Sequence, residues 1–521
     1  MRPEFPGLRP YGLGDVYAQT GAEASRFDAR SIDEIGVPQP VLMENAGRCA
    51  AILLDLLYSG ATVTGLVGAG NNGGDALVVL RTLQSWGYRV RAVAVSDRDM
   101  TDPLLHGWSL NIVADHELDE AGWSRLLAPG TVVVDGLLGT GARGAPRERQ
   151  AAVIRRVNAS RVPVLALDVP SGVDSDTGLV EGDAVQAAVT IAFGSPKIGS
   201  LLHPGRAFAG RHVAVEIGFP PLGWDDGNAL LVTPEWARSR IPRRATDTHK
   251  NREGRVLIIG GQVGMAGAVI LAARAAFAAG AGLVRIVSAV ENREIIQTAL
   301  PEAMFLAWDD PDDVDIVCAQ SDAIVVGPGL GGGEAASAAL DRVLAAGDCP
   351  VLLDADALNL VAARSIDLSS ITPTRSVLLT PHPGEMERLL GVMKSDPMAT
   401  VESAVSRFGC AVLYKGTPSI VAAPGRPALI DTQSSSDLAV AGMGDTLSGV
   451  CATLLAQGLG PHVAGALGLY LSGRATHLAA RGVGLTPSDV TRFLPDALAE
   501  DGDSSSDLAF PFVHFDADPP R

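Results

Sequence analysis

Short apolar runs, each followed by a loop of glycine and polar residues, recur along most of the chain. The runs have the length and the Val, Leu and Ile content of buried strands, and Ala-rich stretches of helical length separate them. This alternation predicts an α/β protein in which helices cover parallel sheets. The clearest predicted strands are residues 61–67, 88–95, 131–135, 162–168, 254–259, 322–326, 351–354, 377–379 and 411–414.

Composition indicates a protein of several domains. The chain has 521 residues, of which 47% are hydrophobic, with 59 Gly and 33 Pro. This length exceeds what one hydrophobic core usually organises. Periodicity is lost between Pro220 and Arg244, which indicates a linker. We expect domains at residues 1–225 and 245–497, a linker at 226–244, and a disordered acidic tail at 498–521.

Net charge and cysteine content restrict the binding partners and the cellular compartment that we expect for this protein. A net charge of −18 argues against nucleic-acid binding, because a polyphosphate backbone would be repelled. The five cysteines are isolated, which favours buried thiols in a reducing compartment over disulfides or zinc ligands. No apolar run approaches the ~20 residues of a membrane span. We therefore expect a cytoplasmic protein without nucleic-acid or membrane partners, and we also expect a homo-oligomer.

A glycine-rich segment, residues 68–75, directly follows the first predicted strand, and a helix is predicted over Ala76–Trp86. Glycines at the carboxyl end of a parallel strand lie where open sheets bind ligands. The side chains of Asn71, Asn72 and Asp75 can ligate a hard cation or hydrogen-bond ribose and phosphate. The alternative is an Asx-rich turn without a ligand.

Two further strands end in the same way. Asp135 ends a buried run and leads into the small residues 136–144, and Asp168 ends the next run before residues 169–174. Carboxyl ends of parallel strands meet at one edge of a sheet, so these residues and the asparagine segment are expected to converge. The convergence favours a binding site.

Four ordered motifs, Met43–Gly47, Asn71–Asp75, Asp135–Gly136 and Asp168–Gly172, resemble the epimerase domain of the NAD(P)H-hydrate repair enzymes. The resemblance spans residues 15–220. It implies a Rossmann-like three-layer domain that interconverts the R and S forms of NAD(P)H hydrated at carbon 6 of the nicotinamide ring.

The resemblance also implies roles for single residues. Asp168 is the candidate catalytic residue, because the ring nitrogen can assist loss and return of the hydroxyl while a carboxylate shuttles the proton. The implied potassium ligands are Asn72, Asp135 and Ser171. The implied hydrate-binding residues are Asn71, Asn72, Gly73, Gly74, Asp75, Gly139, Thr140, Gly141, Ala142, Arg143, Gly144 and Asp168. Ala76 stands where many relatives have glycine, and we expect activity to survive this change.

In the second half, the segment Ala441–Thr446 precedes the apolar run Leu447–Leu455. The small residues allow backbone amides to turn toward an anion, and the run predicts a helix whose N-terminus favours phosphate. Asp445 then lies in the first turn, where it can accept a proton from a hydroxyl that attacks phosphorus. The alternative is a turn whose aspartate only caps the helix.

The succession of strand and loop motifs over residues 245–495 resembles a ribokinase-like fold, and more narrowly the ADP-dependent dehydratase domain of the same repair enzymes. The resemblance implies dehydration of S-NAD(P)HX while ADP, with magnesium on its phosphates, is cleaved to AMP and phosphate. Asp445 is the implied catalytic residue. The implied hydrate contacts are Ala268, Gly331, His382 and Asp445. The implied nucleotide contacts are Lys415, Gly416, Thr417, Pro418, Ser419 and Gly444.

Two features of the second half leave alternatives open. His382 lies between two prolines and can instead set the shape of its loop. Ser434–Leu438 replaces the Asn-Pro pair that relatives usually carry before the glycine-aspartate motif, which bears on nucleotide preference or rate.

The sequence leaves three functions open. The first is a fused epimerase and dehydratase with NADHX, NADPHX and ADP as substrates, and the second is a small-molecule hydroxyl kinase with an accessory nucleotide-sensing front domain. In the third, the front domain is a non-catalytic sensor or scaffold. The kinase alternative leaves the motifs of the front half unexplained. Phosphorylation makes the departure of the hydroxyl easier, because hydroxide alone is a poor leaving group, so dehydration coupled to ADP cleavage is chemically consistent.

Overall fold

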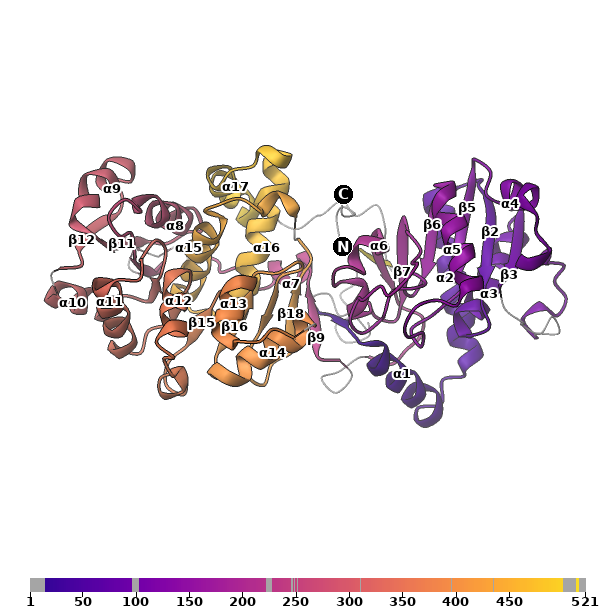
Figure 1. Cartoon of the computed structure of the whole chain (residues 1–521), viewed down its shortest axis with the longest axis horizontal. Coiled ribbons are helices and arrows are strands. Elements are labelled where there is room, and N and C mark those ends of the chain that lie inside the picture. Colours follow the sequence, from indigo (N-terminus) through magenta and orange to yellow (C-terminus); the bar gives the residue numbers. More distant parts are fainter. Residues whose placement is uncertain are drawn as a thin grey trace. The chain divides into compact units, whose positions relative to one another are not determined.

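The computed structural model describes residues 15–95, 103–221, 227–244, 247, 249–250, 252–309, 311–394, 396–433, 435–499 and 512–514. It divides into two compact units, residues 1–231 with 504–521 and residues 232–503. Each unit contains a mostly parallel sheet between helices (Figure 1). The predicted α/β class is therefore confirmed.

The sheet of the first unit has the strand order β4-β3-β2-β5-β6-β7-β8-β19, in which only the β8–β19 pair is antiparallel. The strands are β2 (Thr62–Val67), β3 (Val90–Ala94), β4 (Ile112–Ala114), β5 (Thr131–Gly136), β6 (Val164–Leu167), β7 (Val189–Phe193), β8 (Arg211–Val215) and β19 (Phe512–His514). Outside this sheet, β1 (Val16–Ala18) and β9 (Ala229–Val232) pair in antiparallel fashion.

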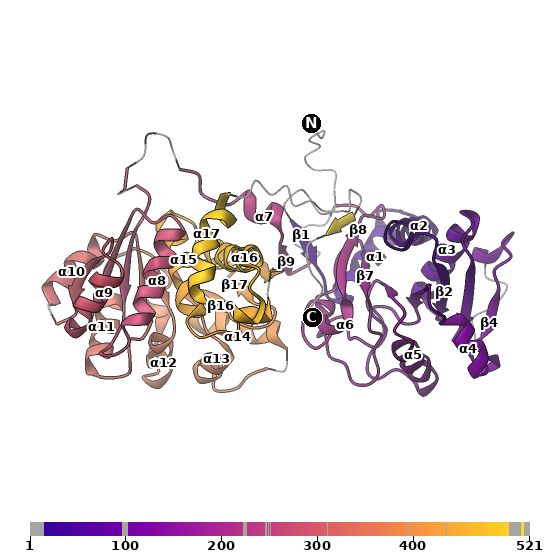
Figure 2. The same cartoon turned by 90° about the horizontal axis from the view of Figure 1, so that it is seen from above.

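Helices cover both faces of this sheet (Figure 2). They are α1 (Gly21–Ala29), the π-helix η1 (Arg30–Glu34), α2 (Gln39–Tyr58), α3 (Asn71–Ser85), α4 (Glu120–Leu126), α5 (Glu148–Ser160) and α6 (Arg206–Ala209), with 3₁₀ turns at Pro103–Leu105, Asp115–Glu117 and Ile198–Ser200. Successive residues of β2 face opposite sides, as strand geometry requires. Val63 and Val67 pack in the core with α2 and α3, whereas Leu66 packs with α5.

The order of the strands places a crevice between β2 and β5. The chain runs outward from β2 to β3 on one side and from β5 to β6 on the other, so the loops that follow β2 and β5 diverge. This topological switch point is where open α/β sheets bind ligands. It holds the glycine-rich segments predicted from the sequence.

The second unit has the strand order β12-β11-β10-β13-β14-β15-β16-β17-β18, parallel up to β16 and antiparallel beyond it. The strands are β10 (Arg255–Ile259), β11 (Leu283–Ser288), β12 (Met304–Ala307), β13 (Ala323–Val326), β14 (Val351–Leu353), β15 (Val377–Leu379), β16 (Ala411–Tyr414), β17 (Ile420–Ala422) and β18 (Ala428–Asp431). The switch point here lies between β10 and β13.

In this unit, α8 and α15 to α17 pack together over one face, and α11 to α14 lie over the other (Figures 1 and 2). The helices are α7 (Pro234–Arg238), α8 (Ala266–Ala278), α9 (Arg293–Ala299), α10 (Pro311–Ala319), α11 (Glu334–Ala345), α12 (Asp356–Ala363), α13 (Pro383–Leu390), α14 (Pro397–Phe408), α15 (Met443–Ala456), α16 (Pro461–Ala479) and α17 (Pro487–Ala499), with 3₁₀ turns at Val290–Asn292, Leu368–Ser370, Ser436–Leu438 and Gly482–Gly484.

Two stretches at the expected domain borders contain regular structure. The expected linker, residues 226–244, includes β9 and α7, because Ala229–Val232 is an apolar run and Thr233 caps the helix through the Trp236 amide at 3.1 Å. In the expected tail, Phe512–His514 forms β19, while residues 500–511 and 515–521 lie outside the described residues.

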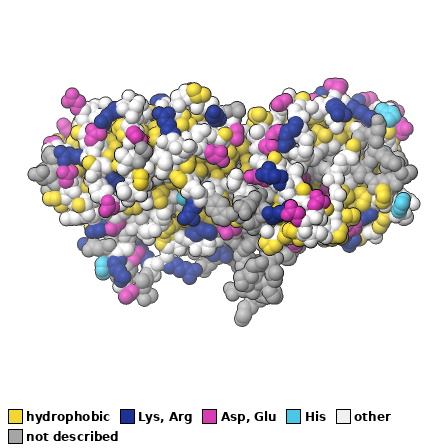
Figure 3. Space-filling model, turned by 90° about the horizontal axis from the view of Figure 1, so that it is seen from below, with side chains coloured by type: hydrophobic (Ala, Val, Ile, Leu, Met, Phe, Trp, Pro, Cys, Tyr) yellow, Lys and Arg dark blue, Asp and Glu magenta, His cyan; other side chains and the backbone are white. Residues whose placement is uncertain are grey.

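Surface charge does not gather into one basic patch on the face drawn in Figure 3, where acidic and basic side chains are interspersed. Within the described residues, no helix combines the length and the low polarity needed to cross a lipid bilayer.

Candidate active sites

A cavity of about 760 Å³ lies at the switch point of the first unit. The segments that follow β2 and β5 line it, so the structure brings together most of the hydrate-binding residues predicted from the sequence. Those that line the cavity are Asn71, Asn72, Asp75, Gly139, Thr140, Gly141, Ala142, Arg143, Gly144 and Asp168. Gly73 and Gly74 are buried beside it in α3.

The segment Asn71–Asp75 is the beginning of α3, whereas the sequence predicted a loop with the helix starting at Ala76. Position 73 requires glycine because a Cβ there would lie 2.0 Å from the Gly68 carbonyl oxygen, leaving no room for a side chain. The buried Ala76 similarly faces Gly136, where an added Cβ would lie 2.6 Å from the Ala76 Cβ. Close approach of β2, β5 and α3 therefore explains the glycines.

Asp135 and Ser171 are buried and hydrogen-bonded to each other, and Leu138 connects them to Asn72, which lines the cavity. The Asp135 carboxylate accepts hydrogen bonds from the Ser171 backbone amide at 2.9 Å and from its hydroxyl at 2.7 Å. Within the described residues, no basic side chain forms an ion pair with Asp135, and burial raises its pKa.

The side-chain amide of Asn72 is held in place through its nitrogen. Its Nδ2 donates to the carbonyl oxygens of Leu138 at 2.7 Å and Leu167 at 3.1 Å, which fixes the orientation of the side chain. Its Oδ1 is buried without a hydrogen-bond partner. Within the described residues, Asn72 thus has a buried oxygen without a partner, Asp135 is a buried carboxylate without a counter-ion, and hydrogen bonds through Leu138 and Ser171 connect the two residues, an arrangement that fits a bound cation. The donor set is all oxygen, as a hard cation prefers.

Asp168 follows β6 in a left-handed backbone conformation, with φ of +67°. Strain of this kind is found at functional sites, where the surrounding structure maintains it. Its Oδ1 accepts hydrogen bonds from the Lys197 ammonium at 2.5 Å and from the Phe193 amide at 3.2 Å. Lys197 is 3% exposed and also donates to the carbonyl oxygens of Phe193 and Ser195. Asp168 is therefore a rigidly held, ion-paired carboxylate that lines the cavity.

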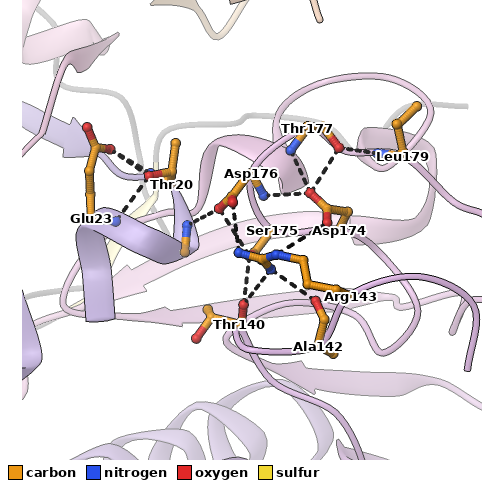
Figure 4. Close-up of polar contacts among 11 residues, drawn as sticks. Thr20, Glu23, Thr140, Ala142, Arg143, Asp174, Ser175, Asp176, Thr177 and Leu179 are labelled. Carbon is orange, nitrogen blue, oxygen red and sulfur yellow. Dashed lines mark hydrogen bonds and ion pairs between the residues drawn. The ribbon is translucent and has the colours of Figure 1, made fainter. Parts of the chain in front are cut away.

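Arg143 connects the loop that contains Thr140 with the segment Asp174–Asp176 (Figure 4). Its guanidinium donates to the Thr140 carbonyl oxygen at 2.9 Å and to the Asp176 carboxylate at 2.7 Å. Asp176 also accepts from the backbone amide of Gly21 at 2.6 Å, at the beginning of α1. Through these contacts Arg143 and Asp176 connect the Thr140 loop, the segment Asp174–Asp176 and the beginning of α1.

The sequence analysis missed Lys197 and Asp28, both of which line the cavity. Lys197 comes four residues after β7, a buried strand, so its place at the carboxyl end of that strand was a readable signal. Asp28 lies on α1, whose contribution to the cavity depends on tertiary packing and left no signal in the sequence.

In the second unit, Asp445 lies in the first turn of α15, as predicted. The helix begins after Gly442, whose φ of +89° turns the chain into it. Burial, followed by the neighbouring Asp354 carboxylate, raises the pKa of Asp445 to about 7. A half-buried carboxyl group that titrates near neutral pH can serve as a general base.

A network centred on Asp354 holds Lys415 next to Asp445. Asp354 is 1% exposed and accepts hydrogen bonds from the Lys415 ammonium at 2.7 Å and from the Ser448 hydroxyl at 2.7 Å. Lys415 also lies 3.9 Å from Glu385. A Cβ at Gly444 would lie 3.4 Å from the Lys415 ammonium, so the structure brings these two predicted nucleotide contacts together.

The remaining predicted residues of the second unit lie on neighbouring loops and helices. The Gly331 amide donates to the Asp356 carboxylate at 2.8 Å. Ala268 is on α8, next to the turn at Gly329. The segment Gly416–Ser419 follows β16. His382 is the N-cap of α13, where its Nδ1 accepts a hydrogen bond from the Gly384 amide at 3.0 Å. This contact is consistent with a role in shaping the loop, and the predicted contact of His382 with the hydrate stays a prediction.

Two α/β units, each with glycine-rich turns at the carboxyl ends of parallel strands and titratable carboxylates near them, define a two-domain enzyme acting on small molecules. A family profile described as NAD(P)H-hydrate dehydratase matches residues 256–496, and one described as YjeF-related protein N-terminus matches residues 39–199.

Relatives match along almost the whole chain. The bifunctional NAD(P)H-hydrate repair enzyme of Moorella thermoacetica is 35% identical over 517 residues, which cover 93% of this chain and 97% of that protein. Its Escherichia coli counterpart is 36% identical and covers 88% of each. A solved structure, the ADP/ATP-dependent NAD(P)H-hydrate dehydratase from Bacillus subtilis, is 30% identical over 51% of this chain and 96% of that one, with a TM-score of 0.44. The chain belongs to the family of bifunctional NAD(P)H-hydrate repair enzymes, which confirms the family predicted from its motifs.

Proposed function

We propose that this chain repairs hydrated NADH and NADPH in two steps. The first unit interconverts the R and S forms, and the second removes water from the S form while ADP is cleaved to AMP and phosphate. Family membership supports both steps and accounts for the two halves together, whereas the kinase alternative leaves the front half without a role.

In the first unit, Asp168 is the proposed proton-transfer residue. The ring nitrogen supplies the electron pair that releases the C6 hydroxyl, so the protein has only to move a proton and position the ring. The ion pair with Lys197 and the Phe193 amide hold the Asp168 carboxylate in one orientation at the cavity. A fixed carboxylate reduces the cost of ordering the site at the moment of reaction.

Potassium is the proposed cation of the first unit, held by Asn72 Oδ1, Asp135 and Ser171. When bound, it supplies the positive charge that the buried Asp135 carboxylate lacks. The same residues connect α3 with the segments after β5 and β6, so they hold the walls of the cavity together.

In the second unit, Asp445 is the proposed base. It accepts the proton of the C6 hydroxyl as that oxygen attacks the β-phosphorus of ADP, and the phosphate then leaves carbon 6 far more readily than hydroxide. Amides at the beginning of α15 face the developing negative charge. Lys415 to Ser419 and Gly444 bind the nucleotide, and magnesium enters on its phosphates. Ala268, Gly331 and His382 contact the hydrate.

The observation that supports this function is the occurrence on one chain of two α/β units, each with a candidate proton-transfer carboxylate, Asp168 in the first and Asp445 in the second. A test of the first site follows purified R hydrate by proton NMR, without nucleotide, in the presence of wild type or Asp168→Ala. Interconversion by the wild type alone supports the proposal, and equal rates at the uncatalysed level would refute it. A cytoplasmic location and a homo-oligomeric state stay predictions of the sequence.

A further inference from the structure

One helical face of the first unit contributes to the cavity without a role in the function described above. Ala24, Phe27, Asp28 and Ile32, at helical spacing along α1 and η1, line the cavity. Within the described residues, the Asp28 carboxylate has no hydrogen bond or ion pair. A carboxyl group with no structural partner that faces a substrate cavity is available for chemistry.

We propose that Asp28 is a second proton-transfer residue of the epimerase, acting on the substrate from a different wall of the cavity than Asp168. The inference rests on the proposed epimerisation. Replacing a hydroxyl on one face of carbon 6 by a water that arrives on the other face requires a proton donor and a proton acceptor. Two carboxyl groups on different elements, α1 and the end of β6, provide such a pair.

The position of α1 is fixed at both ends, so Asp28 is not on a loose helix. At its beginning, the Gly21 amide is bound by Asp176, which Arg143 connects to the loop of Thr140 (Figure 4). Thr20 and Glu23 add reciprocal capping hydrogen bonds.

Near its end, packing and a break in helical geometry fix the rotation of α1. The Phe27 ring lies 5.1 Å from the Phe219 ring, and Phe27 is 4% exposed. Directly after Ala29 the chain passes into the π-helix η1, a feature that often occurs at functional sites. The carboxyl group of Asp28 is thereby presented to the cavity.

The charges that face Asp28 suit opposite roles for the two aspartates. Asp28 is exposed as a whole residue, yet the protein atoms packed around its carboxyl group partly desolvate it and raise its pKa to about 6; Lys197 opposes the shift and Asp168 adds to it. Asp168, by contrast, is ion-paired with Lys197 at 2.5 Å. Two carboxyl groups whose environments differ in this way are the usual arrangement for an acid and a base in one site.

The proposed step balances. As the C6–O bond breaks, the proton of Asp28 passes to the leaving oxygen, which departs as water, and the ring nitrogen pair forms an N–C6 double bond. A second water attacks C6 on the other face and gives its proton to Asp168, and the electron pair returns to nitrogen. Exchange with solvent restores both protonation states. The reverse direction exchanges the roles of the two residues.

The test uses the full chain without nucleotide, so that only the first unit acts, and follows conversion of R hydrate to S hydrate by proton NMR. The variants are Asp28→Asn, Asp28→Glu and the control Glu34→Gln, an exposed carboxylate on η1 that does not line the cavity. Dehydration of S hydrate with ADP serves as the folding control.

We expect Asp28→Asn to lower kcat for epimerisation by about 10²-fold or more. The wild-type rate of epimerisation should fall as pH rises through about 6, because the donor must be protonated. The pH profile of Asp28→Asn should lack this descending limb. Asp28→Glu should recover part of the rate and the limb, and Glu34→Gln should match the wild type.

An Asp28→Asn variant with the wild-type rate and pH limb, while the wild type outpaces the uncatalysed reaction, overturns this inference alone. The same holds if Asp28→Glu is as slow as Asp28→Asn and equally flat with pH while both dehydrate S hydrate normally. A wild type that does not accelerate interconversion overturns the epimerase function as well, so the two failures are distinguishable.

Discussion

At the scale of single residues, burial and charged neighbours set the pKa values of the carboxyl groups. Asp354 is almost completely buried, yet the Lys415 ammonium and hydrogen bonds hold its pKa below the usual range. Asp445, in the same candidate site, has its pKa raised to about 7 by burial and by the Asp354 carboxylate, although Lys415 opposes the shift. We therefore propose different roles for the two groups: Asp354 positions Lys415, and Asp445 takes the proton.

Asp445→Asn is expected to lower dehydration of S hydrate by about 10²–10⁴-fold, because it removes the proton acceptor with little change of shape. The wild-type kcat/KM should rise with pH through about 7, since the base must be ionised, and the variant should lose this rise. Assays of dehydration across pH with ADP check both statements. Calorimetry of AMP binding shows whether the variant keeps the shape of its nucleotide site. Asp496→Asn, exposed on α17, is the matched control. Near-normal turnover in Asp445→Asn would place the base elsewhere.

Replacing potassium by tetramethylammonium is expected to slow epimerisation and to lower the thermal stability of the first unit, because the Asp135 carboxylate then stays buried without a positive neighbour. Asp135→Asn removes that charge and should make both quantities insensitive to potassium. The measurements are the NMR rate and thermal unfolding at constant ionic strength. Equal behaviour of the wild type in the two salts would contradict a potassium site.

At the scale of elements, close backbone contact shapes the first cavity. A Cβ at Gly68 would lie 2.0 Å from the Leu137 carbonyl oxygen, so Gly68→Ala should destabilise the first unit by about 1–3 kcal/mol and lower epimerisation. At Gly70 an added Cβ meets nothing within 4 Å, so Gly70→Ala should leave stability nearly unchanged. Urea unfolding of both variants compares them. Equal stability would show that β2 and β5 can separate at no cost.

The same scale shows what the sequence could reveal. Strand ends were predictable because apolar runs such as 131–135 stop at a polar residue, and parallel topology then brings Asp135, Asp168 and the asparagine segment to one edge. The beginning of α3 was predicted five residues late, because glycines normally oppose a helix and only the contact with Gly68 explains them. Asp28 could not be found, since its access to the cavity depends on contacts distant in sequence, such as that between Gly21 and Asp176.

At the scale of the whole molecule, one chain carries two candidate sites. Each unit has its own sheet and switch point, and the residues of each proposed mechanism come from one unit. We therefore expect Asp168→Asn to leave dehydration of S hydrate within about twofold of the wild type, and Asp445→Asn to leave epimerisation similarly unchanged, because substitutions that share no partner residues usually act independently. Purified R and S hydrates, assayed separately, measure this. Loss of both activities in either single variant would indicate a shared site.

The central claim is tested most directly by a mixture of R and S hydrates of NADH with potassium, magnesium and ADP, in which the absorbance of reduced nicotinamide is followed. The wild type should restore the absorbance completely, Asp168→Asn should stop near the S fraction, and Asp445→Asn should restore none. No recovery by the wild type with either ADP or ATP would contradict the repair function and favour a small-molecule hydroxyl kinase.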